Sequence, residues 1–290
     1  MNRKMIFLAI LALTLASLAC TININPFNTE NKTGPRVTED INVPFLPGQQ
    51  TTADVTLKFG AGELSLQPGA VDGLISGTAT YNVADFKPVI TTESNNINVE
   101  QGNLKLGGIP FINQDIVNEW ELSLGNRPMS LKIEAGAYTG NYELGGLSIS
   151  KLDVTDGAAK VQLSFSEPNQ IEMTSFEYNT GASNVTLSGL GNANLSEMKF
   201  NGGAGNYTLD FSGQLTRNMT VNIDAGVSTI TVIVPEGVAA ELYNDSNLVT
   251  ISTGGGWEQH GNTYLVAGSG YTITINARLG AGTLKLETSK

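Results

Sequence analysis

The chain has 290 residues, a length that allows one large hydrophobic core or two modest ones. Only 15% of the residues are charged, while Gly, Ser, Thr and Asn are abundant, which favours strands joined by turns over long charged helices. The 16 basic and 27 acidic residues give a net charge of −11, which argues against nucleic acid as a partner. A single cysteine and a single histidine exclude an intrachain disulfide and argue against a metal site, and nothing in the sequence indicates another cofactor.

Residues 1–19 are typical of an export signal. Asn2, Arg3 and Lys4 form a positively charged start, residues 5–19 (MIFLAILALTLASLA) are apolar, and the chain turns polar at Thr21. The apolar run is short for a stable membrane span, which needs about 20 apolar residues. We therefore expect this segment to be removed.

The stretch ASLAC at residues 16–20 resembles the bacterial lipobox, in which a small residue precedes a cysteine that becomes lipid-modified and N-terminal. The resemblance implies lipidation of Cys20 and an exported protein, anchored to the cell membrane by its lipid with the folded domain outside the cytoplasm. Ser17 departs from the more usual leucine three residues before the cysteine. Cleavage by an ordinary signal peptidase and an uncleaved anchor helix are the alternatives.

Residues 20–47, rich in Asn, Thr and Pro, predict a flexible tether behind the lipid. A flexible chain of this length spans on the order of 30 Å, so the folded part would sit clear of the membrane. We place the N-terminal part of the folded domain at residues 48–128. Its repeated and capping C-terminal part follows at residues 129–290.

A glycine followed by alternating apolar residues recurs along the folded part. The glycines are Gly60, Gly136, Gly157, Gly181, Gly203, Gly226 and Gly280. From Gly136 to Gly226 the four steps are 21, 24, 22 and 23 residues, a period typical of repeat architectures built from one supersecondary unit.

Within one unit the apolar residues alternate with polar ones. Leu152 and Val154 precede the glycine, and Val161, Leu163 and Phe165 follow it. A period of two indicates strands with one buried face. We expect these strands to stack on those of the next unit and to share one continuous core, which also takes in Val185, Leu187, Tyr207 and Leu209.

The seven glycines are predicted to make structural turns between strands, because glycine reaches positive φ without a steric penalty. A phosphate-binding loop is rejected, since strands and not helices follow each glycine. The long intervals at residues 60–136 and 226–280 would supply caps. The only stretch with helical potential is 111–120, and residues 252–268 predict a loop and a hairpin.

The C-terminal sequence 221–245, VNIDAGVSTITVIVPEGVAAELYND, and the glycine-rich segment that follows it resemble the bacterial toast-rack domains. These are related to adhesin-like domains and to the C-terminal region of LiaF-like cell-envelope proteins. The resemblance covers roughly residues 50–288, includes VPEGV at 234–238 as a strand start, and implies no established catalysis. The fold class it implies, together with the period, is all-β: a β-solenoid-like stack of short strands of toast-rack type, with about 22 residues per repeat.

Candidate chemistry is sparse. His260 lacks a convincing nucleophile and orienting partner, so a catalytic role is not expected. Asp210, Asp224, Glu134 and Glu143 are of the type that a carbohydrate-active enzyme would use, but charges at outward strand positions usually serve solubility. A glycine-rich loop carrying Trp257, His260 and Tyr264 is a candidate contact for a partner; the alternative is that its aromatic rings plug the end of the stack.

These observations predict a surface-exposed, non-catalytic bacterial lipoprotein with an adhesin-like, scaffold or envelope-interaction role. The expected partners are the membrane, through the N-terminal lipid, and an envelope polysaccharide or protein. The alternative is a LiaF-like sensor or modulator of cell-envelope stress. A carbohydrate-active enzyme is the third reading.

Overall fold

The structure is a computed structural model that describes residues 33–46, 52–102, 116–246 and 248–289. The predicted signal peptide, Cys20 and the first part of the predicted tether lie outside the described residues. Residues 33–290 form a single compact unit. The described residues contain strands and two short 3₁₀ turns but no α-helix, and no helix among them is long and apolar enough to cross a membrane.

The strands follow one another along the chain with short connections. They are β1 (Val37–Pro44), β2 (Ala53–Ala70), β3 (Gly73–Tyr81), β4 (Pro88–Glu93), β5 (Asn96–Gln101), β6 (Asn118–Gly125), β7 (Met129–Glu143), β8 (Ile149–Ser164), β9 (Ser175–Ser188), β10 (Glu197–Asp210), β11 (Met219–Pro235), β12 (Ala239–Asn244), β13 (Val249–Thr253), β14 (Glu258–His260), β15 (Thr263–Val266) and β16 (Thr272–Ser289). The 3₁₀ turns are η1 (Ala84–Phe86) and η2 (Leu190–Ala193).

All the strands belong to one mixed sheet, so the prediction of an all-β protein is confirmed. Its order is β1-β3-β6-β2-β7-β8-β9-β10-β11-β16-β12-β15-β14, with β5 on β2, β4 on β5, and β13 on β16. The seven long strands β2, β7, β8, β9, β10, β11 and β16 pair in parallel. Antiparallel strands appear only toward the two ends of this series.

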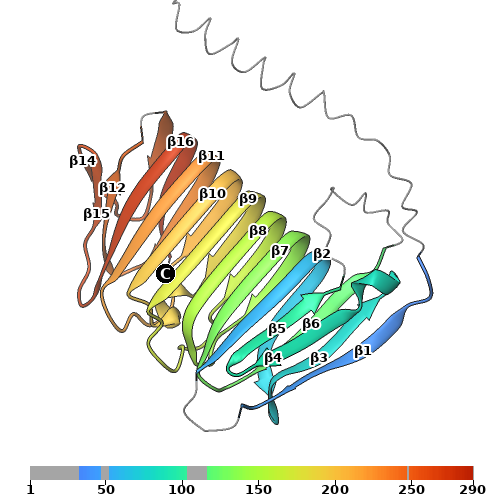
Figure 1. The fold of residues 1–290 in the computed structure, drawn as a ribbon. Helices are drawn as coiled ribbons and strands as arrows, with labels where there is room; N and C mark the ends of the chain where they lie inside the picture. Colours follow the sequence, from blue (N-terminus) through green and yellow to red (C-terminus); the bar gives the residue numbers. More distant parts are fainter. Residues whose placement is uncertain (1–32, 47–51, 103–115, 247, 290) are drawn as a thin grey trace, which may run out of the picture. The chain divides into compact units, whose positions relative to one another are not determined.

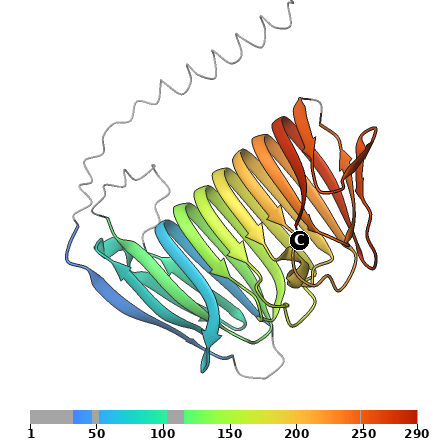
Figure 2. The same cartoon turned by 180° about the vertical axis from the view of Figure 1, so that it is seen from behind.

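Each long strand doubles over near its middle, so that one strand contributes a limb to each side of the sheet (Figures 1 and 2). The residues on the two limbs of β8, Leu152 and Val154 before the bend and Val161 and Leu163 after it, are all buried. They belong to one hydrophobic cluster that also holds their counterparts in the neighbouring strands. The core therefore lies between the two limbs.

The predicted core is confirmed. Val161, Leu163, Val185, Leu187, Tyr207 and Leu209 are each at most 2% exposed and lie in that one cluster. They stand in register, since Val161 pairs with Val185 and Val185 with Tyr207. Aromatic rings continue the stacking across strands: Tyr178 lies parallel to Phe200 with centroids 5.6 Å apart, and Phe200 meets Tyr207 edge-on at 5.0 Å.

The bends coincide with the predicted glycines, but the expected reason for glycine is wrong. None of the seven has a left-handed φ. Instead the glycines stand in a row from strand to strand: a Cβ on Gly157 would lie 3.1 Å from the carbonyl oxygen of Gly136, and one on Gly181 would overlap that of Gly157. Glycine is needed because successive backbones approach too closely for a side chain.

Three further expectations are corrected. Residues 37–44 of the predicted tether form β1, because Ile41 and Val43 alternate with polar residues and are buried against β3. The segment 234–238 ends β11 and turns at Gly237 (φ 85°), so it does not start a strand. Residues 118–120 of the stretch with helical potential begin β6, while 111–115 lie outside the described residues.

The glycine row gives a matched pair of substitutions. Gly181→Ala forces β9 away from β8 and is expected to destabilise the fold by about 1–3 kcal/mol, the usual cost of overpacking. Gly157→Ala meets its neighbour at 3.1 Å and reduces the freedom of the unfolded chain, so its net effect should stay within about 1 kcal/mol. Urea unfolding followed by tryptophan fluorescence measures both, and equal midpoints for the two variants would contradict the stacking argument.

Candidate functional site

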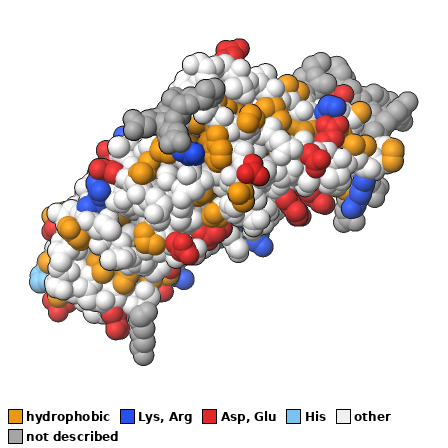
Figure 3. All heavy atoms as spheres, turned by 90° about the horizontal axis from the view of Figure 1, so that it is seen from below, with side chains coloured by type: hydrophobic (Ala, Val, Ile, Leu, Met, Phe, Trp, Pro, Cys, Tyr) orange, Lys and Arg blue, Asp and Glu red, His pale blue; other side chains and the backbone are white. Residues whose placement is uncertain are grey.

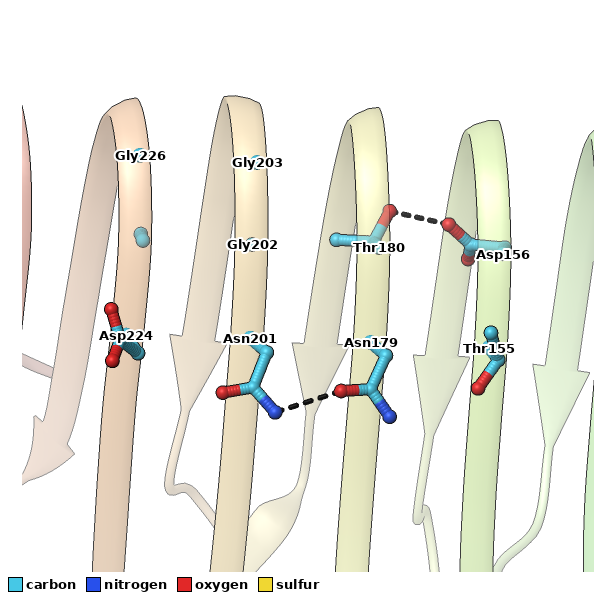
Figure 4. Close-up of a pocket in the computed structure, with 10 residues that line it drawn as sticks. Thr155, Asp156, Asn179, Thr180, Asn201, Gly202, Gly203, Asp224 and Gly226 are labelled. Atoms are coloured by element: carbon cyan, nitrogen blue, oxygen red, sulfur yellow. Dashed lines mark hydrogen bonds between the residues drawn. The ribbon is translucent and has the colours of Figure 1, made fainter.

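The candidate site is an open hollow of about 480 Å³ beside the glycine row, on the outer surface of β8, β9, β10 and β11 (Figure 4). It exists because the outward position at the bend is glycine in every one of these strands, which removes a row of side chains from the surface. The lining residues are Thr155, Asp156, Asn179, Thr180, Asn201, Gly202, Gly203, Asp224, Ala225 and Gly226.

One wall of the hollow is a row of outward polar side chains at equivalent positions of the four strands. Thr155 pairs with Asn179, Asn179 with Asn201, and Asn201 with Asp224. Arg278 of β16 is next in the row and forms an ion pair with Asp224. Parallel strands in register bring these side chains to the strand spacing of about 4.8 Å.

The asparagine amides form a directed chain of hydrogen bonds. Asn179 Nδ2 donates to Glu177 Oε1 at 3.1 Å, and Asn201 Nδ2 donates to Asn179 Oδ1 at 2.7 Å. A carboxylate only accepts, so Glu177 fixes the orientation of both amides. Asn201 Oδ1 consequently points toward the strand of Asp224 (Figure 4).

Charges on this side of the sheet are balanced locally. Lys132 pairs with Glu134 at 2.6 Å and Lys199 with Glu197 at 3.6 Å, and Arg278 pairs with Asp224. Figure 3 shows acidic and basic side chains interspersed with uncharged ones on the face that it presents. The hollow thus offers amides and hydroxyls in nearly neutral surroundings.

A buried polar cluster lies directly inside the bend. Asp156, 6% exposed, accepts hydrogen bonds from Tyr178 Oη at 2.7 Å, Ser183 Oγ at 3.3 Å and Tyr138 Oη at 3.5 Å, and from Thr180 Oγ1. No basic side chain is paired with this carboxylate among the described residues. Hydroxyl donors alone compensate the buried charge.

Burial sets the titration of the cluster. It raises the pKa of Asp156, although the hydrogen bonds from Thr180 and Tyr178 partly oppose the rise. Burial, together with the charge of Asp156, likewise raises the pKa of Tyr138 and Tyr207. All the tyrosines of the cluster therefore stay neutral at physiological pH.

Sequence reasoning missed the role of Asp156. It precedes Gly157, so it was grouped with turn residues, whereas the period of two that makes Val154 inward also makes Asp156 inward. Thr180, at the equivalent position of β9, is inward for the same reason. The alternation was the signal that could have found both.

The predicted contact loop does not form one exposed patch. Trp257 and Tyr264 are 6% and 5% exposed and pack in the core, and Trp257 Nε1 donates to the carbonyl oxygen of Glu287 at 3.2 Å. Only His260 is exposed, with its Nε2 3.8 Å from Glu258 Oε2. Contact with a partner through His260 stays a prediction.

The four candidate carboxylates are not brought together as a pair. Glu134 and Asp224 stand in the outward row, separated by three intervening strands, and each is engaged in an ion pair. Asp210 accepts from the backbone of Ser212. Burial alone would raise the pKa of Glu143, but hydrogen bonds from Ser164, Ser166 and Gly145 outweigh it and lower the pKa. The described residues include no group of three or more His, Cys, Asp or Glu arranged to hold a metal ion.

The profile of the N-terminal domain of toast_rack, DUF2154, matches residues 28–188 and again residues 168–233. The chain belongs to the toast-rack family. The matched part of the toast-rack chain contains β1 to β10, and most of β11, and therefore the whole hollow. It begins within the predicted tether, in agreement with the place of β1 in the sheet.

Solved bacterial structures share the fold. One is described as a "putative cell adhesion protein" from Clostridium sporogenes: it is 20% identical to the toast-rack chain, with a TM-score of 0.50 over 88% of this chain and 100% of that one. Another, a "putative adhesin" from Bacteroides fragilis, is 13% identical, with a TM-score of 0.35 over 87% of this chain and 97% of that one. No curated protein matches the chain.

The buried cluster predicts a pH dependence. Because the pKa of Asp156 is raised in the folded state, its stabilising contribution is present below the unfolded pKa of about 3.9 and is lost as pH rises through the folded pKa. Acidification from about pH 7 to about pH 4 should therefore favour wild type over Asp156→Asn in thermal unfolding. Asp153→Asn, on the outward side of β8, is the control; a difference between wild type and Asp156→Asn that does not vary with pH would contradict the prediction.

Two buried tyrosines provide a second matched pair. Tyr178 Oη donates to Asp156, whereas Tyr207 Oη is buried without a partner among the described residues. Tyr178→Phe should cost about 1–3 kcal/mol of unfolding free energy because it removes a bond to a buried carboxylate. Tyr207→Phe should be neutral or stabilising. Chemical denaturation compares them, and a larger loss for Tyr207→Phe would disprove this assignment.

Proposed function

We propose that this toast-rack protein is an exported lipoprotein that displays a non-catalytic, adhesin-like module for contact with the cell envelope or another surface. The observation that carries the proposal is the outward side of the long strands. There, threonine, asparagine and serine recur at equivalent positions of successive strands, as in the pair Asn179 and Asn201. Repeated equivalent contacts suit weak, multivalent binding of a polymer.

The finer architecture belongs to this proposal. We infer a solenoid in which one long strand and its connection make one coil of about 22 residues. In support, partners in register lie 21 positions apart between Leu131 and Leu152, 24 between Leu152 and Phe176, 22 between Phe176 and Met198, and 23 between Met198 and Val221. Such a stack presents the same outward chemistry at every coil.

The anchoring part of the proposal rests on the sequence. Lipid on Cys20 would place the domain outside the cytoplasm, behind a tether that ends where β1 begins at Val37. The tether is thus shorter than the expected 20–47. The fold shared with the Clostridium sporogenes structure, described as a cell adhesion protein with the qualifier quoted above, agrees with a display role.

The non-catalytic reading is supported by the separation of the candidate acids. A glycosidase holds its two carboxyl groups about 5–9 Å apart. Glu134 and Asp224 are on β7 and β11, four strand spacings or about 19 Å apart. Each is tied to a neighbouring cation and not directed at a shared point.

The proposal predicts that the full chain, produced in a bacterial host, fractionates with membranes and incorporates radiolabelled palmitate, and that Cys20→Ala abolishes the labelling. The purified lipoprotein should co-sediment with isolated cell envelopes and release no reducing sugars from them. Absence of co-sedimentation would refute the binding role. Release of reducing sugars that Glu134→Gln and Asp224→Asn together abolish would show an enzyme instead.

A further inference from the structure

We propose that the outward side of β9, β10, β11, β16 and β12, including the hollow, binds a neutral glycan chain lying across the strands. This inference rests on the proposed envelope-binding function and names the ligand class. It is carried by an unmatched pair of hydrogen-bond acceptors, by the charge balance of this surface, and by an exposed aromatic ring at its end.

The acceptors meet between β10 and β11. Reading the row from β9, Glu177 fixes the amide of Asn179, which fixes the amide of Asn201 with its oxygen toward β11. Reading from the other end, Arg278 occupies Asp224 Oδ2 through Nε at 3.1 Å and through Nη2. Asn201 Oδ1 and Asp224 Oδ1 are left without a donor among the described residues. A hydroxyl group placed between these two strands supplies what this junction lacks.

A second row of amides runs parallel to the first, two residues earlier along each strand. Asn276 Nδ2 donates to Asn222 Oδ1 at 2.9 Å, and Asn276 pairs in register with Tyr243 of β12. The two rows are about 7 Å apart along the strands and their members about 4.8 Å apart across them. The latter spacing is close to the length that one pyranose unit adds to an extended glycan.

Tyr243 ends this second row and is 43% exposed on the outward side. Its hydroxyl is hydrogen-bonded to Glu241, which directs the ring away from free rotation. An exposed phenol ring offers a flat apolar face on which the C–H face of a sugar ring can stack. From β9 to β12 the surface extends over four strand spacings, about 19 Å, enough for several sugar units.

The charges select a neutral chain. The acidic side chains nearest the hollow are matched by Arg278 and, through Glu134, by Lys132. A polyanion would be repelled by the net charge of −11. A polycation would find Asp224 already paired, so a chain that carries hydroxyl groups but no charge fits these residues best.

The test uses the full lipoprotein in detergent micelles and measures binding to an array of neutral glycans and to the neutral polysaccharide fraction of the host's own envelope, with polygalacturonate as the anionic comparison. Wild type is expected to bind at least one neutral glycan and not polygalacturonate. Asn201→Leu and Tyr243→Ser should each weaken that binding at least tenfold, while circular dichroism shows that they fold.

Matched controls separate the site from the general surface. Asn206→Leu alters the same strand and an equivalent amide pair, Asn206 Nδ2 to Asn184 Oδ1 at 3.0 Å, but on the limb beyond the glycine row. Tyr271→Ser removes another exposed tyrosine, 49% exposed. Both should change the affinity by less than twofold.

The outcomes distinguish this inference from the function on which it rests. Binding to envelopes that survives Asn201→Leu, or binding to no neutral glycan, overturns the glycan site and leaves the envelope role standing. Stronger binding to polygalacturonate than to any neutral glycan also overturns it. No binding to envelopes by any variant refutes the envelope role itself.

Discussion

The fold depends on the close approach of backbones at the glycine row. At each bend, a glycine lies over the carbonyl oxygen of the glycine in the preceding strand, with too little room for a methyl group. Because every long strand bends at the same level, its two limbs face each other and bury the alternating apolar residues in one core. The same absence of side chains opens the hollow on the outer surface. One steric constraint thus shapes both the interior and the candidate binding surface.

Inside the bend, the lack of side chains has a second effect. Gly202 and Gly205 leave space that the ring of Tyr207 fills from within, since a Cβ on either glycine would meet that ring or its hydroxyl. The neighbouring strands use the same space for the carboxylate of Asp156 and its hydroxyl donors. Packing at the bend therefore differs from strand to strand even though the backbone path repeats, and a polar cluster occurs where the flanking limbs are purely apolar.

The fold could be predicted largely because its two governing signals are local. Alternation placed Val161, Leu163 and their counterparts in the core, and the recurring glycine located each bend. The failures involve features that depend on neighbours in space. Two apolar residues, Ile41 and Val43, were too few to reveal β1 until β3 was available as a partner. The burial of Trp257 likewise depends on the carbonyl oxygen of Glu287, thirty residues away. The direction of the asparagine amides required Glu177 and Arg278, on separate strands, to be placed together.

The antiparallel strands at the two ends confine the parallel pairing to the middle of the sheet. Duplication of a segment such as β9 with its connection would add one more bend to the glycine row and one more member to each outward row, while both ends kept their present partners. The length of the surface can thus change during evolution by whole units, without redesign of the terminal strands. Relatives of different size would then differ in how much ligand they span and not in the chemistry of each contact.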